Sequence, residues 1–149
     1  MSILSIATSG LSAASLRVNV AASNIANIST TGPLPASGGS GTSAGAGSSS
    51  IAPTFPAAYV PLRVDQVSQS SGSTPGGTVA TVSAVSPSYT AQSDPSAPFA
   101  NQDGLIAAPN VDLANEFAQL AVAKYSFIAN AKVIQAYAET EDTLLDIKT

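Results

Sequence analysis

The sequence predicts a mainly α-helical protein with a small β insert, in which a long helix at each end of the chain flanks several short strands. Two observations favour this fold class. Apolar residues recur in steps of three and four over the first 28 and the last 40 residues, which is the spacing of one helix face. Between these ends the composition changes to a Gly/Ser-rich tract and then to short segments rich in Val and Thr.

The first predicted helix covers residues 1–28. Its apolar seam consists of Leu4, Ala7, Leu11, Ala14, Val18, Ala21, Ile25 and Ile28. Most of these side chains are small and bury little area each, and Gly10 costs such a helix about 1 kcal/mol relative to Ala. We expect Ser2 to cap the start and Thr31-Gly32-Pro33 to end the helix. The helix should be stable only when it packs against a partner.

The middle of the chain is predicted to hold a loop and then a small sheet. Residues 29–50 form a low-complexity tract that is typical of a flexible loop. Residues 51–109 are predicted to form a β-rich insert, with candidate strands at 59–67, 78–85, 88–92 and 105–107. Pro61 favours an edge position for the first strand, and Asp103-Gly104 is a turn signal. Such short strands bury little area by themselves, so we expect them to pack against the helices.

The C-terminal segment, residues 110–149, carries most of the helical signal. Asn110 and Asp112 stand where the N-cap is expected, and Asp112 puts negative charge at the positive end of the helix dipole. The seam consists of Leu113, Phe117, Leu120, Phe127, Ala131, Ile134, Ala138 and Leu145, with polar interruptions at Lys124 and Glu141. A helix free of Pro and Gly from Leu113 to Asp146 would be about 50 Å long, which is more than a small domain needs for its own core. The length of the seam suggests a coiled-coil partner.

The composition excludes several functional classes. Charged residues make up 9% of the 149 residues, and the net charge is −4. The five basic residues are scattered singly, which argues against binding to nucleic acid. The absence of Cys and His removes disulfides, thiolate chemistry, the usual zinc sites and the commonest general base. The nearly neutral surface suits a subunit that other subunits cover.

The N-terminus is a poor secretory signal peptide, because no basic region precedes its apolar residues and polar residues interrupt them. No window reaches eighteen continuous apolar residues, so we expect no membrane insertion.

No catalytic, cofactor-binding or metal-binding set of residues stands out. Glu139, Glu141 and Asp142 form a carboxylate cluster without other ligands nearby in the sequence, so a solvated helix face is the better interpretation. Serines are plentiful, but no familiar triad can be built without His. We therefore expect a protein that is not an enzyme and that needs no cofactor or metal.

Both ends of the chain resemble the axial proteins of the bacterial flagellum, the family of rod, hook and hook-associated subunits. The N-terminal resemblance covers residues 9–27 and includes Ser23-Asn24-Ile25-Ala26-Asn27. The C-terminal resemblance covers residues 109–147 and includes Ala129-Asn130-Ala131-Lys132-Val133. The polar residues that we single out at these ends are Ser23, Asn24, Asn27, Asn110, Asp112 and Asn130.

Within this family the chain looks like the proximal-rod type. Its length leaves no room for the large inserted domains of hook and distal-rod proteins, and Pro109-Asn110-Val111 leads into the last helix after Asn101 and Asp103-Gly104. After Asn27 the chain departs from the family, which usually continues with a Thr, a Gly and an aromatic residue.

The resemblance implies that the two terminal helices pair as an antiparallel, coiled-coil-like hairpin, the axial core domain. It implies a structural subunit of the basal-body rod, which polymerises through its terminal helices into the periplasm-spanning drive shaft that transmits torque from motor to hook. Export would use the flagellar type III apparatus without a cleaved signal peptide. The implied partners are other rod subunits and further copies of this chain in a helical assembly, with motor-ring and export-gate components at the rod base as further candidates.

Other interpretations stay open. A junction protein at one end of the rod would use the same helices to join unlike neighbours. A secreted coiled-coil adhesin or surface structural protein would use the Gly/Ser tract as a stalk, and a hydrolase with an unusual serine would have to act without His. For Asn24, Asn27 and Asn130, helix-end or surface hydrogen bonding competes with contacts between subunits that fix the register of a seam.

Overall fold

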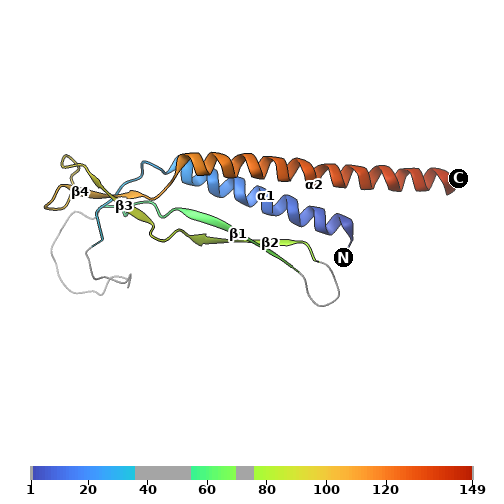
Figure 1. The fold of residues 1–149 in the computed structure, drawn as a ribbon, viewed down its shortest axis with the longest axis horizontal. Helices are drawn as coiled ribbons and strands as arrows, with labels where there is room; N and C mark the ends of the chain where they lie inside the picture. Colours follow the sequence, from blue (N-terminus) through green and yellow to red (C-terminus); the bar gives the residue numbers. More distant parts are fainter. Residues whose placement is uncertain (1, 36–54, 70–75, 149) are drawn as a thin grey trace. The chain divides into compact units, whose positions relative to one another are not determined.

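The computed structural model describes residues 2–35, 55–69 and 76–148 and confirms a mainly helical chain with a small β part (Figure 1). In chain order the elements are α1 (Ile3–Ala26), β1 (Leu62–Ser68), β2 (Thr78–Ala84), β3 (Tyr89–Ser93), β4 (Leu105–Pro109) and α2 (Leu113–Lys148). They form two compact units. The first unit contains both helices with β1 and β2, and the second contains β3 and β4 with residues 27–35 and 55–61. Most of the expected loop at 29–50 lies outside the described residues.

In the first unit, α1 and α2 pack side by side and run antiparallel, as predicted (Figure 1). Asn24, near the end of α1, bonds to Glu116 near the start of α2, whereas Gly10 lies against Asn130 much farther along α2. The core of this unit consists largely of alanine, because Ala13, Ala14 and Ala123 are each no more than 3% exposed. Small side chains let the two helices approach closely.

The β1–β2 hairpin belongs to the same unit and packs along α1, which confirms for these two strands the expectation that the strands pack against the helices. The expectation is not confirmed for β3 and β4, which belong to the second unit. The strands pair antiparallel, from Leu62 opposite Ala84 to Ser68 opposite Thr78. Leu62 is half-buried and the next residue is exposed, an alternation typical of a strand with one covered face. The predicted strand at 59–67 therefore begins three residues late, after Pro61.

The second unit is built on the antiparallel pair β3–β4, which runs from Tyr89 opposite Pro109 to Ser93 opposite Leu105. Gly32 forms an isolated bridge to Ala107, with hydrogen bonds of 3.0 and 2.9 Å between their backbones. The turn predicted at Asp103-Gly104 is present, and Gly104 has φ 71°, a conformation that favours glycine. Asn101 stabilises this turn, because its side-chain Oδ1 accepts the Leu105 N–H at 2.8 Å.

The predicted end of the first helix was wrong by two residues. The helix ends at Ala26, whereas the apolar seam predicts that it continues to Ile28. The Asn27 carbonyl accepts the Thr30 N–H at 3.0 Å, and its side-chain Oδ1 accepts the Thr30 hydroxyl at 3.3 Å. These bonds form a turn that replaces the continuing helix, as Asn residues commonly do.

By length and composition α1 is the one helix among the described residues that could span a membrane, with a mean hydropathy of 1.2 over its best window. This is weak evidence, because core helices of soluble proteins and signal sequences meet the same criterion. In this molecule the alanine face of α1 is covered by α2.

Both predicted helix caps are present. Ser2 Oγ accepts the Leu4 N–H at 3.2 Å at the start of α1. Asp112 Oδ1 accepts the Ala114 N–H at 3.0 Å, and the Asp112 carbonyl accepts the Glu116 N–H at 3.0 Å. Asp112 is therefore the N-cap of α2.

Replacing Asp112 by Ala should destabilise the protein by about 1 kcal/mol, because it removes the acceptor of an orphan N–H and the favourable charge at the helix start. Asp112→Asn is the matched control and should stay within about 0.5 kcal/mol of the natural chain, since Asn is an equally good cap. Urea denaturation of the full chain, followed by circular dichroism, measures both. If both variants lowered the free energy of unfolding by the same amount, the role of Asp112 as the N-cap would be contradicted.

Candidate functional site

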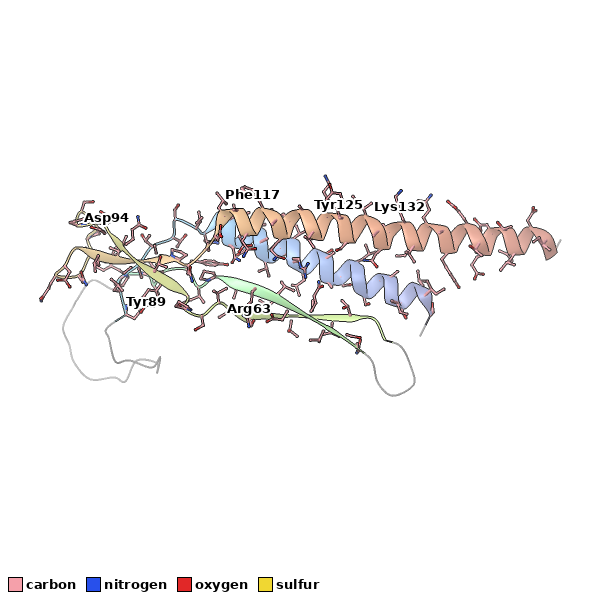
Figure 2. The ribbon with its side chains drawn as sticks, in the orientation of Figure 1. Arg63, Tyr89, Asp94, Phe117, Tyr125 and Lys132 are labelled. Atoms are coloured by element: carbon pink, nitrogen blue, oxygen red, sulfur yellow. The ribbon has the colours of Figure 1, made fainter. Side chains whose placement is uncertain are left out.

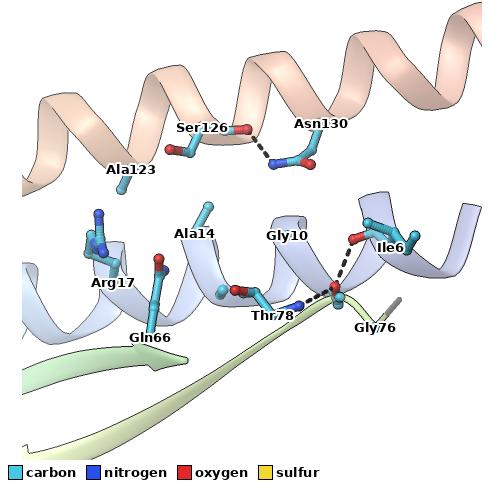
Figure 3. A pocket seen from close by; sticks show the side chains of 13 residues that line it. Ile6, Gly10, Ala14, Arg17, Gln66, Gly76, Thr78, Ala123, Ser126 and Asn130 are labelled. Carbon is cyan, nitrogen blue, oxygen red and sulfur yellow. Dashed lines mark hydrogen bonds between the residues drawn. The ribbon is translucent and has the colours of Figure 1, made fainter. Parts of the chain in front are cut away.

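The α1–α2 interface is organised in three levels that are seven residues apart on each helix. At the first level Asn24 meets Glu116. At the second level Arg17 lies beside Ala123, and at the third Gly10 lies against Asn130 (Figure 3). A spacing of seven residues keeps side chains on one face of a helix. The face of α2 that meets α1 therefore carries polar groups as well as alanine.

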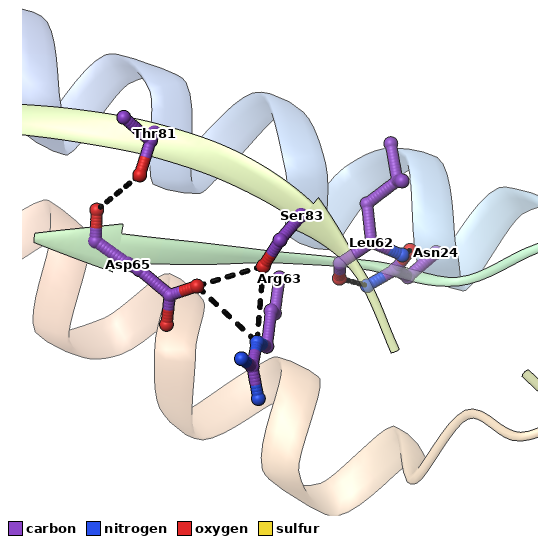
Figure 4. A network of polar contacts seen from close by, with 6 residues as sticks. All are labelled: Asn24, Leu62, Arg63, Asp65, Thr81 and Ser83. Atoms are coloured by element: carbon purple, nitrogen blue, oxygen red, sulfur yellow. Dashed lines mark hydrogen bonds and ion pairs between the residues drawn. The ribbon is translucent and has the colours of Figure 1, made fainter. Parts of the chain in front are cut away.

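At the first level, Asn24 is a fully buried polar residue, 1% exposed. Its Nδ2 donates to the Leu62 carbonyl at 2.7 Å, and its Oδ1 accepts the Leu62 N–H at 3.0 Å (Figure 4). The same Nδ2 donates to Glu116 Oε1 at 2.8 Å. One amide thus joins α1, α2 and the first residue of β1. Because a buried amide without these partners would be costly, Asn24 specifies how the three elements align.

At the third level, Gly10 leaves the space that the Asn130 side chain occupies. A Cβ built on Gly10 would lie 2.6 Å from Asn130 Oδ1 and 2.7 Å from Asn130 Nδ2. The same Nδ2 donates to the Ser126 carbonyl at 2.8 Å, which holds the amide in place (Figure 3). A glycine in the middle of a helix is unfavourable in isolation, and the close approach of Asn130 explains its presence here.

At the second level, Arg17 borders a cavity of about 320 Å³ between α1, α2 and the β1–β2 hairpin (Figure 3). Its Nε is buried and has no hydrogen-bond partner among the described residues. Ala123, which is 0% exposed, stands beside it on α2. Sequence reasoning missed Arg17; the signal was a single charged side chain in a helix that is otherwise uncharged. Ser9 and Thr78 also line the cavity, and Ser9 Oγ accepts the Thr78 N–H at 3.0 Å, which joins α1 to β2.

The structure buries only part of the predicted seams. On α1, Ala7, Ala14 and Ala21 are buried, Leu11 and Ile25 are half-buried, and Leu4 and Val18 are exposed, while Ile28 lies beyond the helix. On α2, Leu120, Ala131 and Ile134 are half-buried, whereas Leu113, Phe117, Phe127, Ala138 and Leu145 are exposed. The residues of α2 that meet α1, namely Glu116, Ala123 and Asn130, thus stand one position before the predicted seam, which contains Phe117 and Ala131. Figure 2 shows Phe117 on the side of α2 away from α1.

The remaining signature residues bond within the chain. Asn110 Nδ2 donates to the Pro87 carbonyl at 2.9 Å and Asn110 N–H to the Ser88 carbonyl at 3.0 Å, so this residue supports the second unit rather than the helix cap. Asn27 forms the turn after α1, and Ser23 is half-buried in α1. Contacts of these residues between subunits stay a prediction.

A groove of about 590 Å³ lies between the same two helices and includes seam residues. Its lining is mostly apolar and consists of Ser15, Val18 and Asn19 from α1 and Leu120, Lys124, Phe127 and Ile128 from α2. Val18, Phe127 and Ile128 are 37 to 45% exposed, so the groove presents apolar surface to solvent.

The titratable groups offer little chemistry. A hydrogen bond with the Glu141 carboxylate, together with its negative charge, raises the pKa of the Tyr137 phenol. Within the described part of the chain, no three acidic side chains lie close enough to hold a metal ion.

Replacing Asn24 by Leu should destabilise the protein by about 2–4 kcal/mol, because it leaves the Leu62 backbone and the Glu116 carboxylate without their buried partner. The matched control is Asn19→Leu on the exposed side of α1, which should change the stability by less than about 0.5 kcal/mol. Denaturant unfolding of both full-length variants gives the comparison. If Asn24→Leu lowered the free energy of unfolding as little as Asn19→Leu does, the Asn24 amide would not hold the unit together.

A double-mutant cycle tests the contact between Gly10 and Asn130. With Asn130 present, Gly10→Ala should give no gain in stability, because the new methyl group displaces the amide. With Asn130→Ala, the same change should stabilise the protein by about 1 kcal/mol, the ordinary helix preference of Ala over Gly. Thermal and denaturant unfolding of the four proteins provides the coupling energy. A gain of equal size in both backgrounds would mean that the two residues are independent.

Comparisons with known families agree with the resemblance of both ends. The family model described as Flagella basal body rod protein matches residues 4–33, which include α1. The family model described as Flagellar basal body rod FlgEFG protein C-terminal matches residues 102–147, which include β4 and nearly all of α2. No curated protein matches the chain significantly. The two matches lie in the expected order and together cover about half of the sequence. The chain therefore belongs to the flagellar basal-body rod protein family.

Proposed function

We propose that this structural protein polymerises through α1 and α2 into the rod that crosses the periplasm and transmits torque from motor to hook. The observation that carries the proposal is the apolar surface that the helix pair leaves uncovered. Phe117 is 55% exposed and Leu145 64% exposed, although both belong to the predicted seam. Together with Phe127 and Ile128, which are exposed side by side in the groove, they give α2 a series of exposed apolar side chains, and contiguous apolar surface of this kind is typical of interaction sites.

The weak core of the first unit supports the same proposal. Alanine supplies most of its buried side chains, and each contributes far less than a buried Leu or Phe. An isolated subunit should therefore be marginally stable, and neighbours would add the missing burial. We infer that the chain is exported unfolded, without a cleaved signal peptide, and completes its folding during assembly.

The proposed place is the proximal rod, because the described residues between the helices form only four short strands. Its proposed neighbours are other rod subunits and further copies of itself. Motor-ring and export-gate components at the rod base are further candidate neighbours.

Quantitative mass spectrometry of purified hook–basal bodies tests the proposed place. We expect the chain to be present in a small, fixed ratio to an established rod protein. Its absence from these particles, together with its recovery from the medium or the cell surface, would contradict the proposal and favour a secreted coiled-coil protein.

The variant Phe117→Asp tests the role of the seam. Since Phe117 is exposed, the monomer should keep its helix content and melting temperature, whereas incorporation into basal bodies should fall at least about tenfold, the effect of about 1.4 kcal/mol. Tyr125→Asp is the matched control, because Tyr125 is 72% exposed on the same helix and lies off the seam. An equal defect in both variants, or normal swimming with Phe117→Asp, would contradict the role of the seam.

A further inference from the structure

The last part of α2 has no partner within its own subunit. Continuing the three interface levels by seven residues places Ile3, the first residue of α1, opposite Tyr137. The segment Ala138–Lys148, which we name the overhang, therefore extends beyond α1 by about 16 Å at 1.5 Å per residue (Figure 1). Three large apolar side chains of the overhang are 58 to 77% exposed, namely Leu144, Leu145 and Ile147.

Charge is strongly separated along the helix pair. The overhang contains Glu139, Glu141, Asp142 and Asp146 against Lys148, a net charge of −3 by sequence. The paired part, residues 3–26 and 113–137, contains Arg17, Lys124 and Lys132 against Glu116, a net charge of +2. The β1–β2 hairpin adds no net charge, because its Arg63 and Asp65 pair at 3.2 Å (Figure 4).

The acidic overhang is unfavourable for an isolated helix. The C-terminal end of a helix carries partial negative charge, so Asp or Glu in the last turns destabilises it and Lys or Arg would be preferred. Asp146 lies in the last turn and Asp142 in the turn before it. A positively charged surface that receives the overhang would remove this disadvantage.

The groove beside α1 has the properties that the overhang requires. Val18, Phe127 and Ile128 present exposed apolar surface to a helix that itself exposes Leu144 and Leu145. Lys124 stands in the groove lining without an ion pair in the described part of the chain. On the overhang, Glu141 precedes Leu144 and Leu145 by three and four residues, so the three side chains share one side of the helix.

We propose that the overhang of one copy lies in the groove of a second copy, so that subunits join head to tail along their helix pairs. Leu144 and Leu145 pack against Phe127 and Ile128 of the other copy, and Glu141 pairs with its Lys124. The overhang cannot reach the groove of its own subunit, because both lie on the one continuous helix α2. This inference rests on the proposed function in that it supplies the contact by which the rod subunit would polymerise.

Disulfide trapping tests the contact directly, since the natural chain has no Cys. Ile128→Cys and Leu145→Cys are made in separate full-length chains, which are then mixed and oxidised. These positions are about 25 Å apart along one straight helix, so any link joins two copies. We expect a disulfide-linked dimer between the two variants. In the matched control, Thr81→Cys on the exposed face of β2 takes the place of Ile128→Cys. If the control pair gave as much disulfide-linked dimer as Ile128→Cys with Leu145→Cys, the proposal would be overturned.

Charge reversal tests whether the pairing is specific. Lys124→Glu alone and Glu141→Lys alone should each lower the yield of the trapped dimer about fivefold, which corresponds to about 1 kcal/mol. The chain that carries both changes should recover the natural yield, because each groove then meets an overhang of opposite charge. Failure of the double variant to recover would overturn the pairing of these two residues.

A photo-reactive benzoylphenylalanine at position 128 identifies the occupant in assembled basal bodies. We expect cross-links to the tryptic peptide 133–148 of a second copy. Cross-links to a different rod protein instead would overturn the choice of occupant while leaving the rod function intact. If the chain is absent from basal bodies but the disulfide dimer still forms in solution, the head-to-tail contact stands and the proposed function fails.

Discussion

The close packing of two helices through small side chains governs the rest of this structure. Ala13 and Ala14 on α1 and Ala123 on α2 are almost completely buried, and Gly10 allows the Asn130 side chain to enter the interface. Small residues permit a short distance between helix axes, but they bury little apolar area. The first unit therefore depends on well-matched contacts more than on a large hydrophobic core.

Polar groups supply the register that alanine cannot specify. A stripe of alanines can slide along another helix with little change in packing, whereas a buried amide has only one arrangement that satisfies its donors and acceptors. Asn24 satisfies this requirement with Leu62 and Glu116, and it joins the hairpin to the helices at the same point. The helix pair and the β1–β2 hairpin are thus aligned by one residue.

A subunit built in this way leaves its larger apolar side chains outside. Phe117, Phe127 and Leu145 stay exposed, while the charges separate into a positive paired part and a negative overhang. Both features are unfavourable for a solitary molecule, the first through exposed apolar area and the second through the helix dipole. In the proposed contact between copies both features would become favourable, which would connect the weak core of the subunit to the family's structural role.

Much of the local structure could be predicted from the sequence, because it depends on neighbouring residues. The periodic apolar spacing predicted α1 and α2, the side chains of Ser2 and Asp112 predicted their caps, and Asp103-Gly104 predicted the turn before β4. The predicted end of α1 at Ile28 was wrong, because Asn27 forms a turn through hydrogen bonds with Thr30. A pattern of apolar residues contains no information on such bonds.

The arrangement of the helix faces was decided only by the tertiary structure. An apolar pattern identified the seam through Phe117 and Phe127, but α1 packs on the adjacent face that contains Glu116, Ala123 and Asn130. Polar and small residues are invisible to such a pattern, although they control how closely helices approach. The sequence by itself thus determined which segments become helices and to which family the chain belongs. Which face is buried depends on partners distant in the sequence, and only the folded chain brings those partners together.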